Sequence, residues 1–111
     1  MEKSMETIIQ GDNKPIVLEF DESIAGMEQF SAMLYSDSQT YRQWEISDVT
    51  IDGNTLFLPL TQKETLAIQS RYVDLEVKFL ADGDIEFFDV IRLYVKQRRD
   101  GTVFDLGGAQ P

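Results

Sequence analysis

The side chains that could do chemistry in this chain are carboxylates, because histidine and cysteine are both absent. Their absence excludes thiol nucleophiles, thiolate or imidazole metal sites and imidazole relays. Two clusters of acids lie at turns: Asp82, Asp84 and Glu86 at one, Asp48 and Asp52 at another. Oxygen clusters suit calcium, but this spacing matches no calcium-binding loop. We interpret these acids as turn formers and predict no metal site and no cofactor.

Carboxylate pairs could also support glycosidase chemistry if they lay across a cleft. With twenty acidic side chains on a domain of 111 residues, close pairs arise by chance. A domain of this size also offers little concavity for a substrate. We therefore predict no catalytic residues, and a small enzyme is the least favoured of the functions that the sequence permits.

The charge balance argues against nucleic acid as a partner. Ten basic side chains against twenty acidic ones give a net charge of −10, whereas phosphate binding needs a basic surface. The basic run Lys96-Gln97-Arg98-Arg99 is interpreted as a solvated strand end that discourages edge pairing, with a grip on an acidic partner as the alternative.

No targeting or membrane segment is expected. The opening residues carry charge without an apolar stretch behind them, and no apolar run approaches the roughly 20 residues needed to span a bilayer. We expect a cytoplasmic site of synthesis and no membrane partner.

The aromatic side chains could form a stacking platform for a sugar or a protein partner. Trp44 is the obvious candidate, but a lone tryptophan in a strand is more often part of the core. We expect Trp44 and Ile46 to face inward. Tyr35 and Tyr41, on either side of a polar loop, are expected to expose their rings.

Alternation of apolar and polar residues with a period of two dominates the chain and predicts an all-β protein. The clearest strands span Tyr72–Leu80 and Ile85–Val95, joined by the turn signal Asp82-Gly83. Thr61 to Glu64 matches a capping box and predicts a single helical turn before them. About seven short strands at this spacing are typical of an immunoglobulin-like antiparallel β-sandwich, and a small barrel is the alternative.

The other expected strands share the same alternation and are bounded by polar or glycine-containing turns. They are Thr7–Gln10, Pro15–Phe20, Gln29–Tyr35, Tyr41–Ile51 with a break near Ser47-Asp48, and Leu56–Leu60. We expect residues 1–104 to form one domain and residues 105–111 to form a flexible tail.

The final hairpin has a second apolar face. A two-residue turn at Asp82-Gly83 pairs Leu80 with Ile85 and places Phe87 two residues further along the returning strand. Because Val77 faces the core, Leu80, Ile85 and Phe87 should lie together on the opposite face. We predict that these three side chains form an assembly contact; cover by a loop or the tail is the alternative.

The same register makes a prediction about the core side of the returning strand. Phe88 and Val90 should join Val77 in the core. The next apolar residues, beginning at Ile91, have the opposite parity, and a bulge near Val90-Ile91 would turn them inward.

Three parts of the chain carry a family resemblance. They are Thr7-Ile8-Ile9-Gln10-Gly11-Asp12-Asn13-Lys14-Pro15, the central Leu60-Thr61-Gln62-Lys63-Glu64-Thr65-Leu66, and Val73 to Lys78 with the later Asp82-Gly83, Val95-Lys96 and Asp100-Gly101-Thr102-Val103. With these segments the chain resembles small structural proteins of tailed phages and prophages of Gram-positive bacteria, including the N-terminal domain of baseplate upper proteins. The similarity ends at Val103.

The resemblance implies an immunoglobulin-like sandwich that acts as a virion building block or adaptor and has no catalytic residues. The partners of such a protein would be other virion proteins or further copies of itself. Its final location would be the virion. The competing function is a carbohydrate-binding or adhesion module, although the lack of a signal peptide favours the first.

Overall fold

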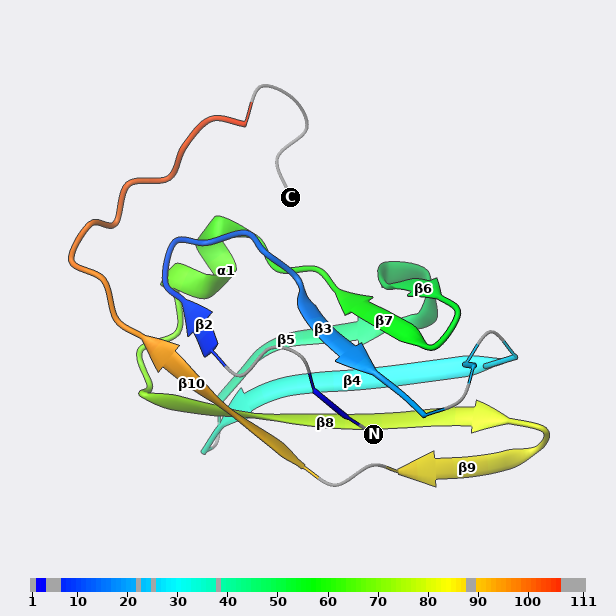
Figure 1. Ribbon diagram of the computed structural model, residues 1–111. Coiled ribbons are helices and arrows are strands. Elements are labelled where there is room, and N and C mark those ends of the chain that lie inside the picture. Colours follow the sequence, from blue (N-terminus) through cyan, green and yellow to red (C-terminus); the bar gives the residue numbers. More distant parts are fainter. Residues whose placement is uncertain are drawn as a thin grey trace.

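The computed structural model describes residues 2–3 (backbone only), 7–21, 23–24, 26–37, 39–87 and 90–106 (Figure 1). In these residues the chain forms two β-sheets packed face to face, with one short α-helix and one 3₁₀ turn beside them. The predicted all-β sandwich is therefore confirmed.

The smaller sheet contains four strands and the larger sheet six. In spatial order the smaller sheet comprises β1 (Glu2–Lys3), β3 (Ile16–Glu19), β7 (Thr55–Leu58) and β6 (Thr50–Asp52). The larger sheet comprises β2 (Thr7–Ile9), β10 (Ile91–Lys96), β8 (Tyr72–Ala81), β4 (Gln29–Ser36) and β5 (Gln39–Glu45), with β9 (Asp84–Phe87) also paired to β8.

The strand order is that of an immunoglobulin sandwich. When β1 and β2 are taken as two halves of a first strand, the smaller sheet follows the order A-B-E-D and the larger sheet A-G-F-C-C′. All described pairs are antiparallel except β2 with β10, which run parallel. The described strands number ten instead of about seven, because the first strand is divided, the 3₁₀ turn separates β5 from β6, and the last strand is interrupted between β9 and β10.

The core lies between the two sheets and follows the predicted alternation. On β8, Val73, Leu75 and Val77 are buried while the residues between them point outward. Strand β10 repeats the pattern with its own alternate apolar residues, Ile91, Leu93 and Val95. Burial of one face of each strand is the main source of stability in such a sandwich.

The expectation that Ile46 faces inward is wrong. The alternation of β5 stops at Glu45, where a 3₁₀ turn (Ile46–Asp48) begins, and Ile46 is 36% exposed. The Glu45 amide donates to the Asp48 carboxylate at 2.9 Å, which favours a turn over continued extension. The predicted break near Ser47-Asp48 is confirmed.

The interruption of the last strand matches the predicted bulge. Between the Lys78–Phe87 pair and the Leu75–Ile91 pair, β8 has two residues and the returning chain has three. The register therefore shifts by one residue, which brings Ile91 to the core side. The expected burial of Val90 is wrong, because Val90 precedes the inward Ile91 and is 50% exposed. Phe88 lies outside the described residues.

Helix α1 (Gln62–Leu66) begins with the predicted capping box. The Glu64 amide donates to the Thr61 hydroxyl at 3.0 Å, and the Thr61 amide donates to the Glu64 carboxylate at 2.9 Å. Thr65, which is fully buried, joins the helix to the turn after β2: its hydroxyl accepts from the Gly11 amide at 2.9 Å and lies 2.8 Å from the Asp12 carbonyl.

Candidate interaction surfaces

The final hairpin extends past the smaller sheet as an arm of β8 and β9 (Figure 1). Leu80 pairs with Ile85 and Lys78 with Phe87, as the turn signal predicts. Asp82 and Gly83 have φ angles of 53° and 81°, and two successive positive values fit a type I′ turn. The local sequence thus determines the register that places the apolar residues.

Leu80, Ile85 and Phe87 lie together on the outer face of the arm, as predicted. Ile85 is 65% exposed and Phe87 72% exposed, so neither is covered by the part of the chain that the structure describes. Leu80 is half-buried. The Lys78 ammonium lies 5.9 Å from the centre of the Phe87 ring and places one positive charge against this apolar face.

A shallow hollow of about 450 Å³ adjoins these residues on the outer face of the larger sheet. Its lining combines apolar side chains of the arm with polar side chains of the neighbouring strands. The lining residues are Gln29, Phe30, Ser31, Gln43, Glu45, Lys78, Phe79, Leu80 and Ile85. A mixture of apolar and polar side chains is typical of protein interfaces.

The acids of the arm are exposed, and those on β9 alternate with Ile85 and Phe87, so they lie on the opposite face of the ribbon. Asp82 and Asp84 lie at the turn, and Glu86 lies on β9 between Ile85 and Phe87. Within the described residues, no group of three acidic side chains is placed to hold a metal ion. These carboxylates give the arm a negative charge of three.

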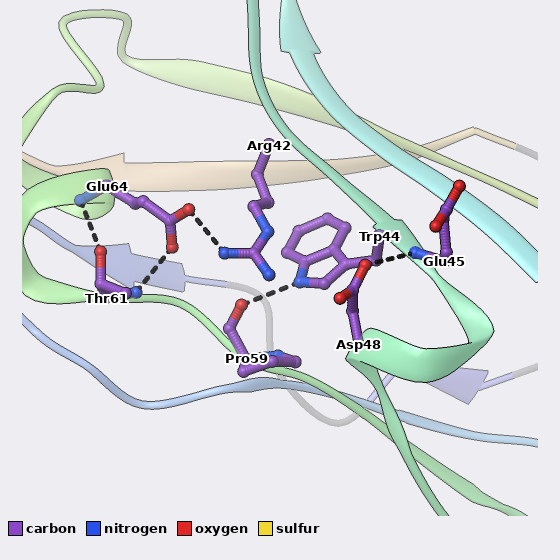
Figure 2. Close-up of polar contacts among 7 residues, drawn as sticks. All are labelled: Arg42, Trp44, Glu45, Asp48, Pro59, Thr61 and Glu64. Atoms are coloured by element: carbon purple, nitrogen blue, oxygen red, sulfur yellow. Dashed lines mark hydrogen bonds and ion pairs between the residues drawn. The ribbon is translucent and has the colours of Figure 1, made fainter. Parts of the chain in front are cut away.

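Trp44 belongs to the core, as predicted, with a fully buried side chain. Figure 2 shows its indole nitrogen donating to the Pro59 carbonyl, at 2.9 Å. The Arg42 guanidinium lies 5.4 Å from the centre of the Trp44 ring and pairs with Glu64 at 2.6 Å. This network ties β5 to the helix α1 and leaves no exposed indole for a ligand.

Tyr35 and Tyr41 are half-buried, so the prediction of exposed rings is wrong for both. The Tyr41 hydroxyl lies 3.3 Å from the Ser70 hydroxyl, and its ring packs against the core. Desolvation raises the pKa of the Tyr35 phenol, and the negative charges of Glu76 and Asp74 raise it further.

Tyr72 and Tyr94 form an aromatic pair that the sequence pattern did not single out. They face each other across β8 and β10, with ring centres 5.7 Å apart in an edge arrangement. Arg92 lies 5.8 Å from the Tyr72 ring and donates to the Asp74 carboxylate at 2.9 Å. The signal was available in the sequence, because both tyrosines occupy outward positions of their strands.

The segment after β10 is anchored through its main chain. The buried Gln62 amide donates to the Phe104 carbonyl at 3.0 Å and accepts from the Phe104 amide at 2.8 Å. Gln10 acts similarly nearby, accepting from the Arg98 amide at 2.9 Å while it donates to the Ile68 carbonyl at 2.7 Å. Residues 107–111 lie outside the described residues, so the flexible tail expected from residue 105 stays a prediction.

The anchored segment presents apolar and basic side chains to solvent. Val103, Phe104 and Leu106 are each exposed, Phe104 by 69%. The basic side chains of the run from Lys96 to Arg99 are exposed as well. Sequence analysis identified the basic run but missed the exposed apolar residues: it placed Val103 and Phe104 in the domain without a role and Leu106 in the flexible tail.

The chain was compared with known protein families and with curated proteins. No model of a known protein family matches the chain, and no curated protein matches it significantly. Among the described helices, none is long and apolar enough to cross a membrane.

Proposed function

We propose that this protein is a non-catalytic structural or adaptor component of a phage or prophage particle, acting through protein–protein contacts of its hairpin arm. The observation that carries the contact role is the exposed apolar group Leu80, Ile85 and Phe87 beside a hollow on the outer sheet face. Exposed apolar clusters on a folded domain commonly mark protein interaction sites. The resemblance of residues 7–103 to phage structural proteins supports the particle as the setting.

The particle role is tested by inducing the cells that encode the protein and purifying the particles released. Quantitative mass spectrometry should find the protein in a fixed ratio to the major structural proteins after nuclease treatment and density separation. Presence only in the unassembled lysate would contradict the particle role.

The contact role is tested with Phe87→Lys, because Phe87 is the most exposed of the three apolar residues. The variant should fold normally but lose its place in the particle. Ile46→Lys is the matched control, since Ile46 is also an exposed apolar residue but lies in the 3₁₀ turn. Equal incorporation of both variants would contradict a contact through the arm.

A second candidate, carbohydrate binding, is favoured by the exposed Tyr72 and Tyr94 rings on the outer face of β8 and β10. Aromatic rings beside the charged Arg92 and Asp74 groups could contact a sugar. A glycan array separates the candidates: binding abolished by Tyr94→Ala but retained in Phe87→Lys would support this function over the first.

A further inference from the structure

The outer face of the larger sheet has balanced charge, although the protein as a whole is strongly acidic. The net charge of the chain is −10. On the side away from the smaller sheet, the described strands of the larger sheet present three acids and three bases: Glu45, Asp74, Glu76, Lys78, Arg92 and Lys96. Two copies of an acidic protein repel each other over most of their surface. A face of balanced charge is a place where two copies can approach.

Two of these charges occupy successive outward positions of one strand and have no ion-pair partner. They are Glu76 and Lys78 on β8. Within the part of the chain that the structure describes, neither the Glu76 carboxylate nor the Lys78 ammonium forms an ion pair. Asp74, by contrast, already binds Arg92 on the next strand at 2.9 Å. The face therefore offers one unpaired acid beside one unpaired base.

The shape of the face changes between the same two positions. Met33 on β4 pairs with Glu76, and Ser31 on β4 pairs with Lys78. Ser31 is small and lines both the hollow of about 450 Å³ and a neighbouring hollow of about 240 Å³. Phe87 continues the second row on the other side of Lys78. One row across the sheet thus carries an acid and a long apolar side chain, and the next outward row carries a base and a hollow.

A single two-fold axis makes these two rows complementary. When two such sheets pack face to face about an axis that runs across the strands, each strand lies over the same strand of the second copy in the opposite direction. An axis midway between the two rows places Glu76 over Lys78 of the second copy and Met33 over Ser31 of the second copy. Each contact occurs twice. The flexible side chain of Met33 suits an irregular hollow such as the one beside Ser31.

The outer face has the size that a stable pair requires. Strand β8 has ten residues and is roughly 33 Å long at about 3.3 Å per residue. The strand positions of β5, β4, β8 and β9–β10 are together roughly 19 Å wide at about 4.8 Å per strand. This flat area, roughly 600 Å² before side chains add relief, approaches the value of about 800 Å² per partner in a standard interface. Ile85 and Phe87, exposed by 65% and 72%, supply apolar surface within it.

We propose that two copies of this protein form a symmetric dimer through the outer faces of their larger sheets, with Glu76 of each copy against Lys78 of the other. This inference rests on the contact role proposed for the arm and names a second copy of the chain as the partner. A contact of this kind closes at two copies, because each copy uses the same surface.

Sedimentation equilibrium of charge variants tests the pairing. Wild type should form dimers and nothing larger. Glu76→Lys should weaken the dimer at least tenfold, because symmetry makes the substitution act twice and sets lysine against Lys78. Lys78→Glu should weaken it in the same way by setting acid against Glu76. A variant with both substitutions exchanges the two charges and should dimerise like the wild type, and an equimolar mixture of the two single variants should form the mixed dimer.

Glu86→Lys is the matched control for charge. It makes the same change of charge on β9, but Glu86 pairs with Phe79 and lies on the opposite face of the ribbon. This variant should dimerise at least as well as the wild type. Weakening by Glu86→Lys equal to that by Glu76→Lys, or a charge-exchanged double variant as weak as the single ones, would overturn the proposal.

The apolar part of the contact is tested without reversing a charge pair. Ser31→Phe fills the hollow, and Phe87→Lys removes the exposed ring; each should weaken the dimer at least tenfold while circular dichroism and melting temperature stay unchanged. Phe104→Lys is the control, because Phe104 is exposed to a similar extent, 69%, but lies in the segment after β10, at the other end of the molecule from the arm (Figure 1). Dimers that tolerate both Ser31→Phe and Phe87→Lys would place the contact elsewhere and overturn the proposal.

These outcomes are separate from the particle role. A wild type that stays monomeric at its highest soluble concentration overturns the dimer, and if it is incorporated into particles the proposed function stands. If the monomer instead binds another particle protein through Phe87, the face belongs to that protein and the dimer is likewise refuted. A dimer with the expected variant pattern that never enters particles supports this inference and refutes the particle role.

Discussion

Replacing Thr65 with valine should destabilise the protein far more than the small change in shape implies. The Thr65 hydroxyl accepts from the Gly11 amide and shares its hydrogen between the carbonyls of Asp12 and Gln62, at 2.8 and 3.0 Å. Valine keeps the volume of the side chain but removes every one of these bonds. The side chain is fully buried, so water cannot replace the hydroxyl at its own position.

The magnitude follows from the groups left behind. A net hydrogen bond is worth about 1 kcal/mol, and a buried amide or carbonyl deprived of its partner costs roughly 1–3 kcal/mol. Because the Gly11 and Asp12 groups are only partly buried, we expect Thr65→Val to lower the free energy of unfolding by about 2–3 kcal/mol. Thr65→Ser keeps the hydroxyl and loses one methyl group, which should cost about 1 kcal/mol.

Urea unfolding followed by the fluorescence of the buried Trp44 measures both values. The slope against urea should stay constant while the midpoint falls. Thr55→Val is the matched control: Thr55 is half-buried on β7, and its hydroxyl makes a single 3.4 Å contact with Asn54. The control should change stability by less than about 0.5 kcal/mol. If Thr65→Val is as stable as Thr65→Ser or more stable, the hydroxyl does not hold the helix to the turn after β2 and the reasoning fails.

Three further predictions follow from local contacts. Trp44→Phe should lower stability by about 2–3 kcal/mol, because it removes the bond to the Pro59 carbonyl and leaves a small cavity. Trp44 is the only tryptophan of the chain, so urea unfolding of this variant is followed by far-ultraviolet circular dichroism, and an unchanged midpoint would contradict the buried indole. Glu76→Gln should lower the raised pKa of Tyr35 toward its ordinary value, as measured by phenolate absorbance, because one of the negative charges that disfavour the phenolate is removed. Since the folded state holds that proton more tightly, the stability linked to Tyr35 is present below the ordinary tyrosine pKa and is lost as pH rises through the folded value. Gly83→Ala should cost about 1 kcal/mol by thermal unfolding, because its φ of 81° strains any residue with a Cβ, whereas the same change at Gly26, which has no such φ and open space around it, should not.

The parts of the fold that sequence analysis predicted are those controlled by nearby residues. The arm is the clearest case: the turn at Asp82-Gly83 and strict alternation on β8 together determine the register, so the outward position of Phe87 followed directly. The capping box at Thr61 was recognisable because both of its partners lie within four residues. The one-residue bulge could be inferred because the parity of the apolar residues changes between β9 and β10.

The features that sequence analysis missed have two causes. One is a local hydrogen bond that competes with the strand pattern, and the other is a contact between residues far apart in the sequence. Ile46 continues the alternation of β5, yet a local bond between Glu45 and Asp48 turns the chain there and exposes Ile46. The Gln62 anchor joins a side chain to the main chain of Phe104, 42 residues later. A main-chain partner leaves no mark on residue type at Phe104, so hydropathy and composition gave no sign of this anchor.

The two sheets differ in the length of their strands. Strand β8 has ten residues, whereas the described strands of the facing sheet have two to four. On the last part of β8, Phe79 still packs against the core, whereas all four residues of β9 are exposed. The part of β8 that pairs with β9 also pairs with β4, so β9 is the outer strand there, and its register is specified by the turn at Asp82-Gly83. Ile85 and Phe87 are therefore exposed apolar side chains that the core does not require, and the contact role proposed for the arm depends on them.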